Sequence, residues 1–227
     1  MLDYISTSSK NFKKNQREKN LYNDILVFLK NQLPYEFDLD YVFETIEGLL
    51  SKKYFSNIDV VYIGSFQEIE ELGFNAMYKD NALYITNKQD NENDMIDDIV
   101  HEIAHAVEER FADSLYLDIT IQNEFLAKRK TLYNILSEEG YYFPLDKYKK
   151  LEYDKGLDDF LYNEVGYPKL TSLSMGLFYS PYAITSLREY WANGFENYFL
   201  RDAIYLKKLS PKLYKKINDL ISLVEES

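Results

Sequence analysis

The only two histidines of this 227-residue chain, His101 and His105, stand four positions apart in the segment HEIAHAVE. Residues four apart on an α-helix lie one turn apart on the same face, so both imidazoles can reach one ion. Glu102 lies beside that face, where it can take a proton from an activated water rather than bind the metal. H-E-x-x-H on a helix is typical of a zinc site. The segment therefore predicts a helix that binds one zinc ion through His101 and His105, with Glu102 as general base.

The residues around this motif predict an amphipathic helix over about 94–112. Its apolar stripe lies roughly opposite the histidines and consists of Ile96, Ile99, Val100, Ile103, Val107 and Phe111. The polar side carries the carboxylates of Asp94, Asp97, Asp98, Glu108 and Glu109. We interpret most of these carboxylates as a solvated acidic face, while some of them could hold the imidazoles in place.

The chain contains no cysteine, which excludes disulfides, thiolate metal ligands and cysteine nucleophiles. A catalytic zinc ion usually has three protein ligands and one water. Because there is no third histidine, the third ligand must be Asp or Glu. Glu109 lies a further turn along the same helix, and three ligands spread over two turns can hardly converge on one ion. Two candidates remain, Glu124 and Glu189.

Glu124 follows His105 by 19 positions. That spacing is similar to the H-E-x-x-H-x18-E pattern of aminopeptidase-type gluzincins, and Asn123-Glu124 resembles their Asn-Glu pair. The alternative interpretation is a pair on a helix surface, because Glu124 stands four positions before Lys128.

Glu189 lies on a second amphipathic helix, predicted over 186–200. The buried stripe of this helix consists of Leu187, Tyr190, Trp191, Phe195, Tyr198 and Phe199. Glu189, Asn193 and Glu196 share the opposite face, as a ligand-bearing side would require. Ser186 and Glu189 also match a capping box, which would explain the glutamate by local hydrogen bonding alone. We favour Glu189 over Glu124 as the third ligand.

HEIAHAVE, together with a tyrosine seven positions before a helical glutamate, resembles the catalytic domain of anthrax lethal factor and its relatives, including the secreted Pro-Pro endopeptidases. The resemblance implies a gluzincin-type zinc endopeptidase in which His101, His105 and Glu189 bind the metal. It further implies that Glu102 is the general base and that Tyr182 stabilises the oxyanion.

The resemblance covers two helices and the loop before the second one, which is well under half of the chain. Tyr179 is the second choice for the tyrosine role. The chain departs from the family at Ala104, where lethal factor has glycine. It also has a longer stretch between His105 and Glu189, which implies an inserted helical segment around 121–163.

Apolar spacing predicts the remaining elements. Helices are expected over 15–30, 38–50, 121–138, 146–163, 186–200 and 211–224, with an irregular segment over 164–185. A buried strand is expected over 58–64, a short helix over 66–72 ended by Gly73, and a hairpin over 74–86 that turns at 79–81. We therefore predict an α+β, zincin-like fold, in which a small twisted N-terminal sheet packs on the active-site helix and a mostly helical lobe follows. The chain is expected to form one catalytic domain over 1–227, with lobes of about 1–112 and 113–227.

Acidic residues outnumber basic ones, 38 against 26, which gives a formal net charge of −12. This balance argues against a nucleic-acid partner and against an anionic membrane surface, since both attract clustered Lys and Arg. The one basic stretch is interpreted as the solvated start of a helix and consists of Lys10, Lys13, Lys14, Arg17 and Lys19. No signal peptide or transmembrane segment is evident, so we expect a cytoplasmic protein unless a non-classical route delivers it elsewhere.

Three functional hypotheses follow. The first is a zinc metalloendopeptidase whose protein or peptide substrate pairs with an edge strand at 82–86. The second is an aminopeptidase-like gluzincin with Glu124 as third ligand. The third is a non-catalytic, zinc-stabilised module that binds a partner through 164–185.

Overall fold

The computed structural model of the protein describes residues 18–226. The chain divides into two compact units: Met1–Ala106 contains a sheet, and Val107–Ser227 is helical. The predicted α+β class is confirmed, with a small N-terminal sheet followed by a mostly helical region. That both units form one catalytic domain stays a prediction. Within residues 18–226, no helix is long and apolar enough to cross a membrane.

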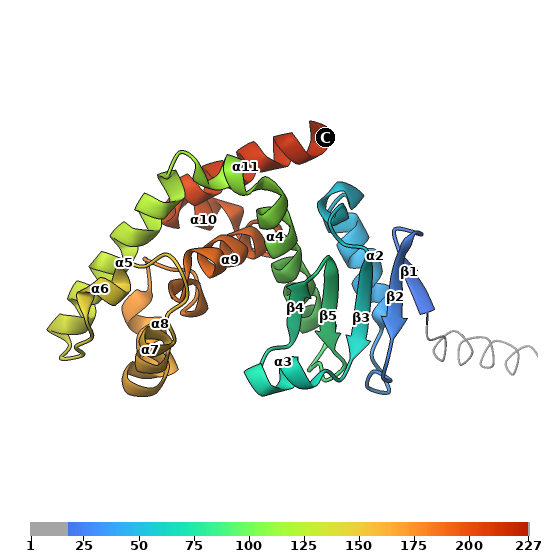
Figure 1. The fold of residues 1–227 in the computed structure, drawn as a ribbon, viewed down its shortest axis with the longest axis horizontal. Coiled ribbons are helices and arrows are strands. Elements are labelled where there is room, and N and C mark those ends of the chain that lie inside the picture. The colour runs from blue at the N-terminus through green and yellow to red at the C-terminus, as the bar shows by residue number, and fades with distance from the viewer. Residues whose placement is uncertain (1–17, 227) are drawn as a thin grey trace, which may run out of the picture. The chain divides into compact units, whose positions relative to one another are not determined.

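The first unit contains a five-stranded mixed sheet in the order β1-β2-β3-β5-β4 (Figure 1). The three central strands β2, β3 and β5 are parallel, whereas β1 and β4 are antiparallel edge strands. The strands are β1 (Glu18–Leu21), β2 (Ile25–Leu29), β3 (Val60–Gly64), β4 (Ala76–Lys79) and β5 (Ala82–Thr86). The helical segments between them are α2 (Leu39–Leu49), the 3-10 helix η1 (Lys52–Phe55) and α3 (Gln67–Leu72).

One face of the sheet forms the core of this unit. Val27, Val61, Leu83 and Tyr78 lie side by side across four strands, and none is more than 6% exposed. Helices complete the core with Val42 and Ile46 of α2 and with Ile99 and Ile103 of α4 (Glu92–Tyr116), all of which are buried. The alternation of side chains along each strand therefore sorts the sheet into a buried and an open face.

The open face carries a row of aromatic rings. Phe28, Tyr62 and Tyr84 are neighbours in register on β2, β3 and β5. Their ring centroids are 6.4 Å and 5.4 Å apart, and each ring is partly exposed.

The predicted helix over 15–30 is wrong from residue 18 on, where the chain forms the antiparallel pair β1–β2, and its first three residues lie outside the described part. Ile25 and Val27 are buried while Leu26 is 40% exposed, which is the alternation of a strand. Tyr22 and Asn23 have positive φ angles and form the turn. Four apolar residues spaced by three and four fit a helix equally well, so the spacing alone could not separate the two structures.

The basic stretch at positions 10–19 lies mostly outside the described residues. Its one described member, Lys19, is in β1 and forms an ion pair with Asp40 of α2. The predicted helix start is therefore wrong at this residue.

The predicted edge strand at 82–86 is also wrong, because β5 lies inside the sheet between β3 and β4. The edge position belongs to β4, the first strand of the predicted hairpin. The hairpin itself is confirmed, and its turn residues Asp80 and Asn81 have φ angles of 51° and 58°. Helix α3 is confirmed as well, ended by Gly73 with a φ angle of 72°.

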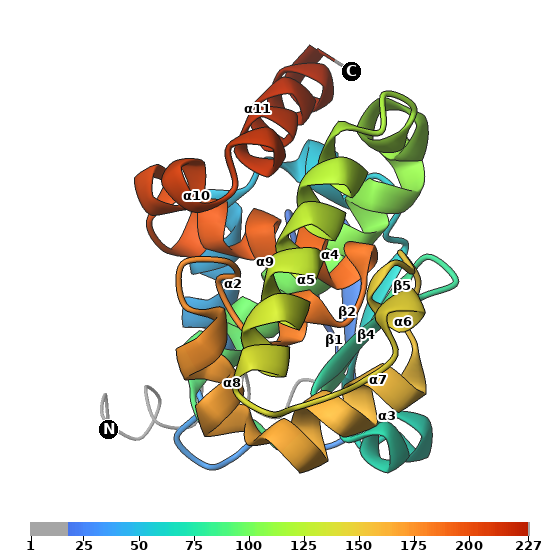
Figure 2. The same cartoon turned by 90° about the vertical axis from the view of Figure 1, so that its left-hand side faces the viewer.

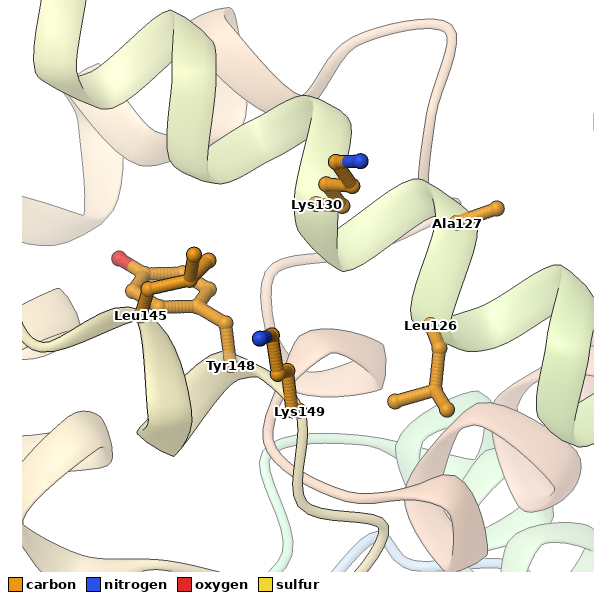
Figure 3. Close-up of a pocket in the computed structure, with 6 residues that line it drawn as sticks. All are labelled: Leu126, Ala127, Lys130, Leu145, Tyr148 and Lys149. Atoms are coloured by element: carbon orange, nitrogen blue, oxygen red, sulfur yellow. The ribbon is translucent and has the colours of Figure 1, made fainter.

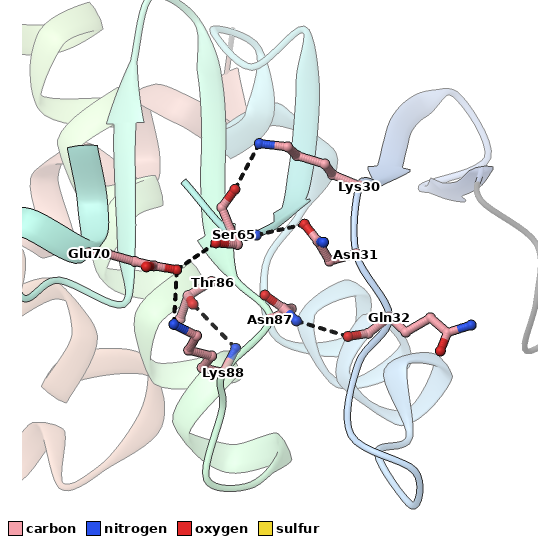
Figure 4. Close-up of polar contacts among 8 residues, drawn as sticks. All are labelled: Lys30, Asn31, Gln32, Ser65, Glu70, Thr86, Asn87 and Lys88. Carbon is pink, nitrogen blue, oxygen red and sulfur yellow. Dashed lines mark hydrogen bonds and ion pairs between the residues drawn. The ribbon is translucent and has the colours of Figure 1, made fainter. Parts of the chain in front are cut away.

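Hydrogen bonds tie together the loops that follow the parallel strands (Figure 4). The Ser65 hydroxyl, just after β3, donates to Glu70 at 2.6 Å, and Glu70 also pairs with Lys88, after β5, at 3.0 Å. Gly64 ends β3 where a Cβ atom would lie only 2.7 Å from the Cβ of Lys30. These contacts fix the segment that leads from β5 into α4.

The second unit is built from helices. They are α5 (Thr120–Glu138), α6 (Leu145–Tyr148), α7 (Lys155–Asp159), the π-helix η2 (Phe160–Gly166), α8 (Tyr167–Ser174), the 3-10 helix η3 (Tyr182–Ile184), α9 (Leu187–Leu200), α10 (Ala203–Leu209) and α11 (Pro211–Glu226). Helices α5, α9 and α11 contact one another (Figure 2).

Two predictions in this unit need correction. The helix expected over 146–163 is interrupted, because Asp154 starts a new helix by accepting a hydrogen bond from the Leu157 N–H at 3.1 Å. The segment expected to be irregular over 164–185 contains α8, which begins after Gly166 and has Pro168 in its first turn.

Candidate metal centre

The predicted metal-binding helix is present as α4, and its histidines lie together. The ligand atoms of His101, Glu102 and His105 all lie within 4.8 Å of one another. The two imidazole centroids are 5.0 Å apart, with ring planes at 81°. His105 is 5% exposed, and His101 and Glu102 are partly exposed. The i and i+4 spacing thus produces the pair of imidazoles that it predicts.

The opposite side of α4 anchors this arrangement. Ile96, Ile99, Val100, Ile103 and Val107 are each at most 3% exposed, which confirms most of the predicted apolar stripe. The helix loses its regular geometry at Phe111, where φ is −115° and ψ is 23°. The histidines lie before this kink, on the straight part of the helix.

The donor set fits a zinc ion. Zinc takes imidazole nitrogens at about 2.0–2.1 Å, so two ligands of one ion lie no more than ~4 Å apart. Ligand atoms within 4.8 Å of one another reach that separation by a small change of side-chain rotamer. The identity of the metal and the remaining ligands stay predictions.

Glu102 is held by the main chain of an edge strand. The N–H of Tyr78 in β4 donates to Glu102 Oε2 at 2.6 Å. Because β4 is the last strand of the sheet formed by residues 18–226, this N–H does not pair with a further strand of that part of the chain. The carboxylate predicted to act as base therefore lies beside the peptide groups that an added strand would meet.

Asp98 is a partly buried carboxylate one turn before His101 on α4. The side-chain amide of Gln89 donates to Asp98 at 3.2 Å and to the Thr86 carbonyl at 3.3 Å. Burial raises the pKa of Asp98 from its ordinary 3.8 to about 6. The Gln89 hydrogen bond and the charge of His101 oppose that rise, while the charge of Glu102 adds to it. The ionised form of this partly buried carboxylate therefore lowers the stability of the folded protein.

Replacing Asp98 by asparagine is expected to stabilise the metal-free protein at pH 8 by up to about 3 kcal/mol. The raised pKa means that between pH 4 and 6 the folded state binds a proton that the unfolded chain does not, so wild-type stability falls as pH rises through this window. Asparagine removes this cost, and the difference should vanish towards pH 4. Urea denaturation at both pH values measures it, with the exposed Asp90→Asn as control. A variant less stable than wild type at pH 8 would contradict the prediction.

Glu124 has a structural role in the second unit. Its carboxylate accepts hydrogen bonds from the Tyr190 hydroxyl at 2.9 Å and from the N–H groups of Lys212 and Leu213 at 2.9 Å and 3.0 Å. It therefore caps the N-terminus of α11. Lys128, which the spacing pairs with Glu124, donates to the carbonyl oxygens of Leu177 and Leu209.

Glu189 lies in the first turn of α9, in the second unit. Its backbone N–H donates to the Ser186 hydroxyl at 3.1 Å, which confirms Ser186 as the cap. One turn later, Asn193 is only 7% exposed, and its Oδ1 has no hydrogen-bond partner among the described residues. The predicted polar side of α9 is thus partly buried.

The two tyrosine candidates differ in their surroundings. Tyr182 is the first residue of η3 and is 40% exposed. The ring of Tyr179 packs on Tyr205 with centroids 5.4 Å apart, and burial raises the pKa of Tyr179. The roles of Glu189 and Tyr182 at the metal stay predictions.

The second unit also contains an apolar pocket of about 300 Å³ between α5 and α6 (Figure 3). None of the predicted site residues lines it. Its lining consists of Leu126, Ala127, Lys130, Leu145, Tyr148 and Lys149.

No model of a protein family matches the chain, and neither does any curated protein or solved structure with which it was compared. The resemblance to lethal factor therefore rests on the two sequence motifs alone.

Proposed function

We propose that this protein is a zinc-dependent endopeptidase, with His101, His105 and Glu189 as ligands. The observation that carries the proposal is the position of Glu102. Its carboxylate lies within 4.8 Å of both imidazole ligand atoms and also accepts the N–H of Tyr78 on edge strand β4. Two imidazoles, a carboxylate and a strand edge thus lie together in one unit of the chain.

The edge strand β4 indicates that the substrate is an extended peptide. An extended peptide can add to a sheet edge through main-chain hydrogen bonds, which do not depend on its sequence. A peptide laid along β4 brings its carbonyl groups past Glu102 and the histidines. This mode of binding needs no free terminus, which favours an endopeptidase over an exopeptidase.

The chemistry follows from the donor set. A zinc ion in this site would polarise the scissile carbonyl and lower the pKa of a water molecule. Glu102 takes the proton of the attacking water and passes it to the leaving amine. Tyr182 donates a hydrogen bond to the oxyanion, which is charged only around the transition state.

Glu189 is the better candidate for third ligand because Glu124 is occupied. Both oxygens of Glu124 already accept hydrogen bonds from the start of α11 or from Tyr190. Moving this carboxylate to a metal would leave those donors unpaired. These hydrogen bonds favour Glu189 over Glu124, the ligand that the aminopeptidase hypothesis needs.

The test is cleavage of unstructured peptides blocked at both ends, followed by mass spectrometry. The zinc-loaded protein is expected to cut them at internal bonds, to lose this activity in a chelator and to regain it when zinc is added. Cleavage confined to peptides with a free N-terminus would overturn the endopeptidase assignment. Bound zinc that raises the melting temperature without cleavage of any peptide would favour the non-catalytic module.

A further inference from the structure

Glu108 is a charged side chain that is only 13% exposed, on the helix that carries the histidines. It lies three residues after His105 and seven after His101. Seven residues are close to two helical turns, so Glu108 and His101 lie on the same face of α4. The carboxylate of Glu108 therefore lies on the histidine-bearing face of α4. It belongs to the part of this helix that is in the second unit, which begins at Val107.

The two oxygens of Glu108 contact two different elements. One accepts a hydrogen bond from the hydroxyl of Tyr116, at the end of α4. The other lies 3.6 Å from Nε of Arg188, in the first turn of α9. Burial, followed by the charge of Glu108, raises the pKa of Tyr116, so this tyrosine stays a hydrogen-bond donor at alkaline as well as neutral pH. Glu108 thus bridges the kink at Phe111 and ties α9 to α4.

Arg188 is the residue directly before Glu189. The same turn of α9 is fixed a second time by Ser186, whose hydroxyl accepts the Glu189 N–H. Two contacts, one through the side chain of Arg188 and one through the N–H of Glu189, therefore hold this turn.

We propose that Glu108 and Arg188 are positioning residues, whose ion pair orients the first turn of α9 so that Glu189 reaches the metal. The inference rests on the proposed function, because it requires Glu189 to be the third ligand. The ion pair is long, with Nε and Oε2 3.6 Å apart, and its arginine is 55% exposed, so it contributes little to folding stability. An effect on the metal would therefore be separate from an effect on the fold.

Two variants with opposite charge changes distinguish a positioning role of the ion pair from simple electrostatic attraction of the zinc ion. Glu108→Gln removes a negative charge and Arg188→Gln removes a positive one, so attraction alone predicts weaker zinc binding in the first variant and equal or tighter binding in the second. Positioning predicts weaker binding in both. We expect each variant to lose roughly 10-fold or more in zinc affinity, as outer residues of metal sites do. The double variant should lose little more than either single one.

The measurement is zinc affinity by competition with a chelating dye, together with the melting temperature of each metal-free variant. Matched controls are Glu109→Gln and Lys208→Gln, which make the same charge changes on exposed side chains of α4 and α10. Weaker binding in both ion-pair variants, with melting temperatures near that of wild type, supports the proposal. Unchanged or tighter binding in Arg188→Gln, or a fall in melting temperature that matches the loss of affinity, overturns it while the endopeptidase proposal stands. A wild-type protein that binds no zinc overturns both.

Discussion

Replacing Glu102 by glutamine is expected to lower the rate of peptide hydrolysis about 10³-fold while zinc stays bound, since a general base contributes roughly 10²–10⁴-fold. Glutamine has nearly the same shape as glutamate but cannot take a proton from the attacking water. Its amide oxygen can still accept the Tyr78 N–H, so the side chain should keep its place. Initial rates at saturating peptide and zinc content per chain measure the two effects.

The control for this variant is Glu109→Gln, which removes the same charge from an exposed position on the same helix. It should be as active as wild type. A Glu102→Gln protein with wild-type activity would show that the proposed mechanism is wrong. A variant without zinc would instead mean that Glu102 is itself a ligand.

Replacing Glu189 by alanine is expected to weaken zinc binding more than ~100-fold, which is the upper range for loss of an outer residue of a metal site. A ligand that contacts the ion directly should exceed this range. The cap of α9 should survive, because it is the backbone N–H of Glu189 that bonds Ser186. Elemental analysis of dialysed protein, with the melting temperature of the metal-free form, measures the change.

Glu124→Ala is the matched comparison, because it removes the other candidate ligand. It should retain zinc but lose about 3 kcal/mol of unfolding free energy, since hydrogen bonds to a charged group contribute roughly 1.5–3 kcal/mol each and are not additive. The lost bonds are those to Tyr190, Lys212 and Leu213. Zinc retained in Glu189→Ala but lost in Glu124→Ala would reverse the choice of ligand and restore the aminopeptidase hypothesis.

The sequence predicts best where local geometry decides the structure. The spacing of His101, Glu102 and His105 predicts both the helix and the contact between the rings, because a helix repeats every 3.6 residues whatever surrounds it. The Asp80-Asn81 turn is equally local. The helix prediction for 15–30 is wrong because the apolar residues there fit both a helical and an alternating pattern. Pairing of β2 with β3 stabilises the strand.

The order of the strands and the fate of single carboxylates depend on residues far away in the sequence. Whether β5 or β4 is the edge depends on which strand pairs with β3, which no residue within 82–86 reveals. The hydrogen-bond partners of Glu124 lie 66 to 89 positions later in the sequence. Its spacing from His105 therefore suggests a metal ligand, whereas in the fold its carboxylate caps α11. The N–H of Tyr78 was missed because every residue except proline carries one.

The hydrogen bond from the Tyr78 N–H to Glu102 determines which substitutions position 78 can accept. Glu102, the proposed general base, accepts its hydrogen bond from a peptide N–H, so this contact places no demand on the side chain at position 78. Only the core does, in which Tyr78 is 6% exposed. Among relatives of this chain, large apolar residues could replace one another at this position without loss of the contact to Glu102. Proline alone would remove it, and an edge strand would otherwise tolerate proline well.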